Sequence, residues 1–203
     1  MGCNSSISNK DKLILFVIGH PGSGQKTQSN LLKTKIKDCE VIHVESLIRH
    51  QSQLKGNLKL DQINEDKLVP SDYLITLLSK ILNKIEQKII IIEGFPKNME
   101  NVNEWKNLIG KKWKIIALVY LKISEETMKE REKEKIEEMG RHFVENKHKR
   151  FMNETVPLLE KLKNEINFIE ENGEKEINDI NQNILTQINK IINEKKYCHL
   201  ENL

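Results

Sequence analysis

Short apolar runs without polar alternation are the feature of this chain that most restricts its fold. They occupy residues 13–18, 41–44, 89–92 and 113–121. A strand that is apolar on both faces is typical of a parallel sheet covered by helices on both sides, whereas a half-exposed strand alternates. We therefore interpret these runs as four parallel strands, and we predict a fifth strand, at the edge of the sheet, over residues 174–180.

Amphipathic helices are predicted between these strands. Apolar side chains recur there every three or four residues, a spacing that gives a helix one buried face. The expected helices cover about residues 26–37, 45–54, 71–85, 98–109, 158–169 and 184–192. Strands that alternate with helices predict an α/β protein whose five-stranded parallel sheet carries helices on both faces.

Length and composition limit the function classes. The 203 residues suffice for one domain, and a net charge of +3 does not require a nucleic-acid partner. Three scattered cysteines indicate neither a disulfide framework nor a zinc site. The apolar runs are too short to span a membrane. We expect a monomer with a polar tail over residues 1–11, a domain over residues 12–195 and a C-terminal tail over residues 196–203.

The N-terminus matches a lipidation pattern. Its first six residues fit M-G-x-x-x-[ST], which places Gly2 for N-myristoylation once the initiator methionine is removed. Cys3 beside it is a candidate for palmitoylation, and two acyl chains anchor a protein stably where one does not. A chance match in a polar tail is the alternative. We predict a cytoplasmic protein that is anchored peripherally to a membrane.

A glycine-rich loop follows the first strand over residues 19–27. A strand, such a loop and a helix N-terminus together present backbone N–H groups and a helix dipole to an anion such as phosphate. The phosphate-loop pattern GxxxxGK[ST] requires lysine at position 25, but the chain has Gln25 followed by Lys26. A one-residue shift turns a helical side chain by about 100°. Either Lys26 reaches the phosphates, or the loop contains a bulge, or the turn binds no ligand.

Glu93 ends the strand at residues 89–92 and is a candidate metal ligand. Ligands of open parallel sheets bind beyond the carboxyl ends of the strands, so Glu93 and the glycine-rich loop are expected at the same edge. A carboxylate beside bound phosphates is suited to Mg²⁺ or to its waters. The alternative is a carboxylate that caps the next turn.

Five short motifs resemble landmarks of the adenylate kinase and UMP-CMP kinase family. They are GHPGSGQKTQ at residues 19–28, LIR at 47–49, LVP at 68–70, EGFPK at 93–97 and TVP at 155–157. They occur in the order of that family and span nearly the whole chain. The resemblance implies a P-loop NTPase-type sheet with an acceptor-binding insert at about residues 44–72 and a short lid at about residues 136–147.

The same resemblance implies transfer of a phosphoryl group from ATP to a nucleoside monophosphate. Carried over by position, the ATP site comprises Gly19, Gly22, Ser23, Gly24, Gln25, Lys26, Thr27 and Arg131. The acceptor site comprises Val44, Arg49, Gly94, Lys97 and Asn101. The catalytic cations are Lys26, Arg131, Arg141 and Lys147, with Arg150 as the alternative to Lys147. Thr27 and Glu93 would hold Mg²⁺, partly through water.

The residues expected at the acceptor base are compatible with two classes of acceptor. Asn101 and the apolar Val44 resemble the UMP-CMP kinases, whereas AMP is the competing acceptor. Asn101 as an exposed helix residue is the alternative to a base contact. Most charges at residues 124–150 fit a solvated helix face.

Departures from the family pattern are concentrated at the expected chemistry. Gln25 replaces the loop lysine, and Lys97, Lys135 and Lys147 stand where arginines are usual. Lysine lacks the bidentate fork of arginine, and loss of one charge that stabilises the transition state costs about 10²–10³ in rate. Two hypotheses follow: a membrane-anchored nucleoside monophosphate kinase with weak activity, or a non-catalytic, nucleotide-binding sensor or scaffold.

Overall fold

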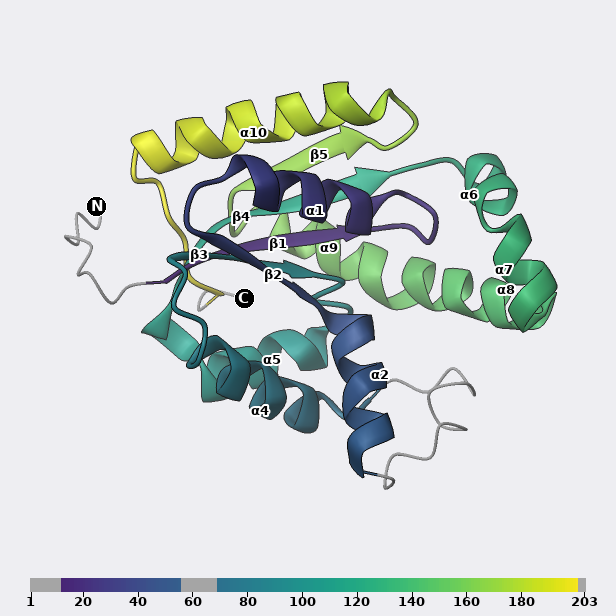
Figure 1. Cartoon of the computed structure of the whole chain (residues 1–203), viewed down its shortest axis with the longest axis horizontal. Coiled ribbons are helices and arrows are strands. Elements are labelled where there is room, and N and C mark those ends of the chain that lie inside the picture. Colours follow the sequence, from purple (N-terminus) through teal and green to yellow (C-terminus); the bar gives the residue numbers. More distant parts are fainter. Residues whose placement is uncertain (1–11, 56–68, 201–203) are drawn as a thin grey trace.

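Five parallel strands form a single sheet in the order β2-β3-β1-β4-β5 (Figure 1). The computed structural model describes residues 12–55 and 69–200. The strands are β1 (Leu13–Gly19), β2 (Cys39–His43), β3 (Ile89–Glu93), β4 (Lys114–Lys122) and β5 (Phe168–Asn172). The predicted α/β class and the four predicted apolar strands are confirmed.

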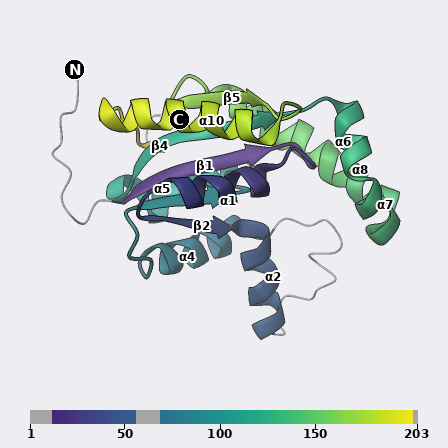
Figure 2. The ribbon, with the colours of Figure 1, turned by 45° about the horizontal axis from the view of Figure 1, so that its top comes forward.

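Helices cover both faces of this sheet, as Figures 1 and 2 show. Helices α1 (Gln25–Lys35) and α10 (Ile177–Asn193) pack on one face, and α4 (Ser71–Leu82), α5 (Met99–Leu108) and α9 (Val156–Leu162) pack on the other. Beyond the sheet lie α2 (Val44–Lys55), α6 (Glu125–Arg131), α7 (Lys133–Met139) and α8 (Arg141–Arg150). A 3₁₀ turn (Gly110–Lys112) follows α5, and a π-helical turn (Phe151–Thr155) joins α8 to α9.

The central strand β1 is buried on both faces. Leu13, Leu15 and Val17 belong to the hydrophobic cluster that includes α1 and α10, whereas the residues between them belong to the cluster of α4, α5 and α9. Residues 13–18 are each at most 2% exposed. A polar side chain at any of these positions would lose its hydrogen bonds to water and would find no partner among the apolar side chains around it. The absence of alternation therefore follows from the position of β1 between two helical layers.

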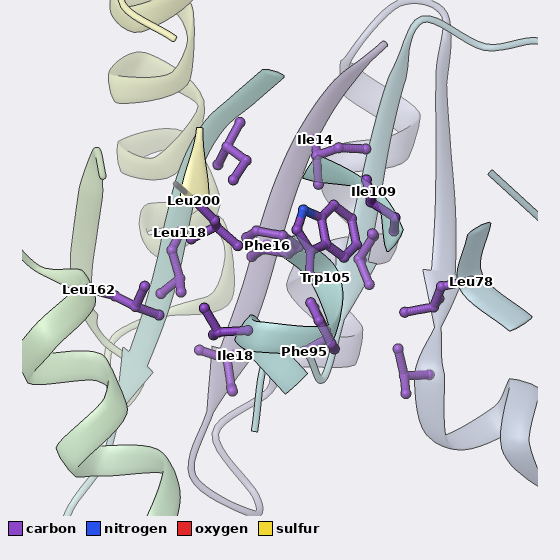
Figure 3. Packing of buried hydrophobic residues seen from close by; sticks show 14 of the residues in the cluster. Ile14, Phe16, Ile18, Leu78, Phe95, Trp105, Ile109, Leu118, Leu162 and Leu200 are labelled. Carbon is purple, nitrogen blue, oxygen red and sulfur yellow. The ribbon is translucent and has the colours of Figure 1, made fainter. Parts of the chain in front are cut away.

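Aromatic side chains hold α5 against β1 (Figure 3). The Trp105 ring meets Phe16 edge-on, with centroids 5.3 Å apart, and it lies 5.4 Å from the Phe95 ring. Phe16 and Phe95 are themselves 5.5 Å apart. Because Phe95 lies in the EGFPK motif, this cluster fixes the loop that follows β3.

The prediction of a fifth strand over residues 174–180 is wrong. Strand β5 lies at Phe168–Asn172, and α10 already begins at Ile177. Ile169 repeats the helical spacing of Leu162 and Ile166 by coincidence, so the predicted helix over 158–169 extends past the real end of α9 at Leu162. Alternation in β5, which buries Ile169 and Glu171, marks a strand with one covered face. Its predicted place at the edge is confirmed, since β5 pairs only with β4.

The two predicted inserts contain helices where they are described. Helix α2 opens the segment at residues 44–72, and α7 and α8 meet at Gly140 within the segment at residues 136–147. At the other end of the chain, Cys198 pairs with Ile115 in an antiparallel bridge and Leu200 is 2% exposed. The last described residues thus pack on the domain.

No helix in the two described ranges is both long enough and apolar enough to cross a bilayer.

Replacing Trp105 with alanine is predicted to lower the free energy of unfolding by about 3–5 kcal/mol, because the side chain is 1% exposed and its loss leaves a cavity. Denaturant titration measures this change. Leu108→Ala is the matched control on the same helix: its side chain is 51% exposed, so we expect a change within about 0.5 kcal/mol. Equal losses in the two variants would contradict the described packing.

Candidate functional site

The glycine-rich loop has the geometry of an anion-binding turn. It leaves β1 at Gly19 and enters α1 at Gln25, with Gly22 (φ 76°) and Gly24 (φ 83°) in the left-handed region. The N–H of Ser23 donates to the carbonyl of His20 at 3.0 Å, which closes the turn. The N-terminus of α1 therefore directs its unpaired N–H groups at the space beyond the sheet.

Close packing restricts side chains in this loop. A Cβ at Gly19 would lie 2.2 Å from Ser23 Oγ and 2.7 Å from the carbonyl oxygen of Leu121. Ser23 is 2% exposed, and its hydroxyl has no hydrogen-bond partner within the described ranges. This hydroxyl is thus buried against Gly19 at a cost in free energy.

The structure excludes one of the three interpretations of Gln25 and Lys26, the bulge in the loop. Helix α1 begins directly after Gly24, and the N–H of Gln28 donates to the Gly24 carbonyl at 2.9 Å, as in a regular helix. The proposed one-residue bulge is therefore absent from the described loop. Gln25 is half-buried, whereas Lys26 and Thr27 are exposed on the first turn of the helix.

Arg131, at the end of α6, lies against the glycine-rich loop. Its Nη1 donates to the Gly22 carbonyl at 3.2 Å and to the Gly173 carbonyl, after β5, at 2.9 Å. A Cβ at Gly22 would lie 3.3 Å from the Arg131 Cβ, so the close approach favours glycine there. Arg131 thus joins the two loops while its side chain stays exposed.

A carboxylate links the loop after β5 to the loop after β4. Glu174 accepts from the Ser124 N–H at 2.7 Å and from its hydroxyl at 2.6 Å. These hydrogen bonds from Ser124 lower the pKa of Glu174 to about 2. The loops after β4 and β5 are therefore linked beside Arg131.

Glu93 begins a chain of hydrogen bonds at the ends of two strands. It is 6% exposed, and its Oε2 lies 3.1 Å from His43 Nδ1. The His43 Nε2 lies 3.0 Å from Asn30 Oδ1 on α1. The register places His43 of β2 opposite Glu93, and Val17 of β1 opposite Glu93 on its other side. The carboxylate thus lies one strand away from the glycine-rich loop, as predicted.

The donor set here fits a hard cation such as Mg²⁺. Thr27 supplies a hydroxyl on the α1 face that also carries Asn30, and Glu93 supplies a carboxylate with a second oxygen beyond the one that contacts His43. In the described part of the chain, no group of three or more histidine, cysteine, aspartate or glutamate residues is arranged to hold a metal ion. Mg²⁺ commonly binds through one or two protein oxygens, phosphates and waters, so Thr27 and Glu93 would be its protein ligands here.

Lys97 projects from the loop that follows β3. Burial lowers the pKa of its ammonium group, and the charges of Lys147 and Arg150 act in the same direction, while Glu45 and Glu93 oppose them. The Lys97 carbonyl accepts from the Thr155 hydroxyl at 2.8 Å. The π-helical turn thereby holds the Lys97 backbone in place.

Asn101 is turned into the protein. It is 4% exposed, its Oδ1 accepts from the Lys97 N–H at 3.1 Å, and its Nδ2 donates to Ser71 Oγ at 2.8 Å. The alternative of an exposed helix residue is therefore wrong. The Asn101 amide positions the Lys97 loop against α4. Its second N–H is the one left for a contact with a base.

The remaining predicted acceptor residues surround the start of α2. Val44 is 1% exposed, and a Cβ at Gly94 would lie 4.0 Å from its Cβ, so these two positions meet. Arg49 lies one turn along the helix, where its Nη2 is 3.3 Å from Glu45. Lys147 of α8 also contacts Glu45, at 3.1 Å.

Other predicted residues lie at the margin of this group or outside the described residues. Arg141 is exposed at the first position of α8, and Lys135 pairs with the buried Glu132 at 2.5 Å. Gly2 and Cys3, the predicted lipidation positions, lie outside the described residues.

Sequence reasoning missed His43, Glu45 and Thr155 as side chains of this site. His43 and Glu45 flank Val44, where a short strand passes directly into α2 at the carboxyl edge of the sheet. Polar residues at such a strand end are candidates for ligand contact. Thr155 was identified only as part of the TVP motif.

Comparisons with known proteins agree with this arrangement. The family model described as adenylate kinase matches residues 17–167. UMP-CMP kinase 1 of Oryza sativa subsp. japonica is 34% identical over 101 residues, which are 47% of this chain and 40% of that protein. UMP-CMP kinase 3 of the same plant is 32% identical over 130 residues, or 62% of this chain and 60% of that protein.

A bacterial relative matches over a longer range. The adenylate kinase of Campylobacter hominis is 27% identical over 192 residues, which are 91% of this chain and 97% of that protein. The chain thus spans nearly all of the bacterial relative, but only 40% to 60% of the two plant proteins.

His20, in the glycine-rich loop, makes the stability of the protein depend on pH. It is 6% exposed and packs 4.6 Å from the Phe151 ring and 5.8 Å from the Tyr120 ring. Burial, followed by the charge of His148, lowers the pKa of His20 from 6.5 to about 4. The unfolded chain therefore binds an additional proton between these pH values.

The contribution of His20 to stability is predicted to be complete above pH 6.5 and to be lost as the pH falls towards about 4, with a slope of at most about 1.4 kcal/mol per pH unit. Denaturant titrations at several pH values measure the slope. His20→Phe should make it shallower, while the exposed His50→Phe should leave it unchanged. An unchanged slope in His20→Phe would disprove the assignment.

Proposed function

The chain belongs to the adenylate kinase family, and from this premise we propose that it transfers the γ-phosphoryl group of ATP to a nucleoside monophosphate. The observation that carries the proposal is the meeting of two features at one sheet edge. An anion-binding loop and helix N-terminus lie beside a group of lysines and arginines contributed by α2, α8 and the loop after β3.

The ATP phosphates would bind at the glycine-rich loop. The unpaired N–H groups at the start of α1 would provide donors, and the helix dipole favours negative charge. Arg131, whose Nη1 donates to the Gly22 carbonyl, would reach the same phosphates. Lys26 would add a charge from the exposed side of the first helical turn.

Mg²⁺ bound with ATP would neutralise phosphate charge. Thr27 and Glu93 are the residues proposed to hold it, partly through water. The contact of His43 with Glu93 Oε2 holds the carboxylate through one of its oxygens, and the other oxygen would bind Mg²⁺ or one of its waters.

The acceptor monophosphate would lie between α2 and the loop after β3. Val44 and Gly94 form an apolar wall there, while Arg49, Lys97 and Lys147 provide positive charge. Because the transition state of phosphoryl transfer spreads charge over oxygens, positioning and cations supply most of the catalysis. We propose UMP or CMP as the acceptor, with AMP as the competing candidate.

A coupled assay with ATP and Mg²⁺ against AMP, UMP, CMP and GMP tests the activity and ranks the acceptors. Lys26→Ala is expected to lower kcat by about 10²–10³, because it removes a charge directed at the transferred group. Lys35→Ala, an exposed lysine in the last turn of the same helix, is the control and should retain activity.

One outcome would count against the kinase, and another against the role of Lys26. If ATP binds in calorimetry but no monophosphate accepts a phosphoryl group, the chain is a nucleotide-binding sensor or scaffold. If Lys26→Ala and Lys35→Ala have equal activity, turnover does not use Lys26.

We further propose that Gly2 is myristoylated and that Cys3 is palmitoylated, which would anchor the kinase to a membrane through two acyl chains. Labelling with azido-myristate in cells is expected to mark the wild type and not Gly2→Ala. Cys3→Ser should keep the label but move the protein towards the soluble fraction. Equal labelling of wild type and Gly2→Ala would exclude myristoylation at this position.

A further inference from the structure

Glu45 connects the two helices that flank the acceptor site. It is the second residue of α2, and its Oε1 lies 3.3 Å from Nη2 of Arg49 on the same helix. Its Oε2 lies 3.1 Å from Nζ of Lys147, which is 102 residues away on α8. Both oxygens of one carboxylate are thus engaged by two cations that the acceptor phosphate would also need.

The charges around Glu45 show that its carboxylate is the negative centre of this cluster. Partial burial raises the pKa of Glu45, but the positive charges of Lys147, Lys97 and Arg49 outweigh that effect and leave the pKa below its usual value. The carboxylate is therefore ionised at neutral pH. Lys97, in turn, interacts electrostatically with Glu45 and Lys147.

A carboxylate and a phosphate make the same kind of contacts with such cations. Both present oxygen acceptors to guanidinium and ammonium groups through charge-assisted hydrogen bonds. A phosphate that entered between Arg49 and Lys147 would meet a like charge at hydrogen-bond distance from the same nitrogens. The two anions cannot occupy the cluster without repulsion.

We propose that Glu45 competes with the acceptor phosphate for Arg49 and Lys147. The monophosphate has to displace this carboxylate before it can bind, so Glu45 sets the acceptor affinity and with it the KM. The inference rests on the proposed function, because it takes this cluster to be the acceptor phosphate site.

Calorimetry without ATP tests the competition directly. Glu45→Gln keeps the size of the side chain but removes its charge, and it should lower the Kd for UMP, CMP, AMP and ribose 5-phosphate by about tenfold, since two exposed ion pairs no longer oppose binding. Uridine, which has no phosphate, should bind equally to the two proteins. Glu194→Gln, which removes a carboxylate paired with Lys196 at the end of α10, is the control and should leave every Kd unchanged.

Glu45→Ala provides a second variant, and circular dichroism checks that each variant is folded. An unchanged or higher Kd for the phosphorylated ligands in both variants would overturn the proposal, as would an equal gain for uridine. The readout is binding, so it differs from that of the kinase proposal. If the wild type shows no turnover while Glu45→Gln still gains affinity for phosphates, the kinase fails and the competition stands. If turnover occurs, Glu45→Gln should lower KM for the acceptor more than it alters kcat.

Discussion

Burial of β1 on both of its faces is the constraint on which the rest of the structure depends. Its two faces contact separate hydrophobic clusters, and its backbone pairs with β3 and β4. The glycine-rich loop leaves this strand at Gly19, where even a methyl group would meet Ser23 and Leu121. The loop is therefore held by a strand that is buried on both faces, and the N–H groups at the start of α1 are positioned before any ligand arrives.

The parallel arrangement of the strands explains why distant residues meet beside this loop. Every strand ends at the same edge, and the register sets His43 and Val17 on either side of Glu93. The strand ends supply the glycine-rich loop, this carboxylate chain and the Lys97 loop. Arg49 and Lys147 come from helices beyond the sheet, so their placement depends on how α2 and α8 approach each other across its edge (Figure 1).

This division explains which features the sequence predicts. Buried strands have recognisable local hydrophobic patterns, so the strands at residues 13–18 and 89–92 and the loop after β1 could be predicted from the sequence. Strand β5 could not, because Ile169 continues the helical spacing of α9 by chance. Contacts such as Glu45 with Lys147 join elements 102 residues apart, and no local period encodes them. The inward turn of Asn101 depends likewise on Ser71, 30 residues away.

The lysines of the acceptor cluster require a negative charge beside them, and Glu45 supplies it. Lysine is a strongly hydrated point charge without the fixed fork of arginine, so Lys97 and Lys147 do not orient themselves and repel one another when brought together. The Glu45 carboxylate, whose charge acts on both lysines, offsets that repulsion and holds the Lys147 ammonium at 3.1 Å. The same contact raises the free energy of phosphate entry. Order in the ligand-free cluster and affinity for the acceptor therefore oppose each other through a single side chain.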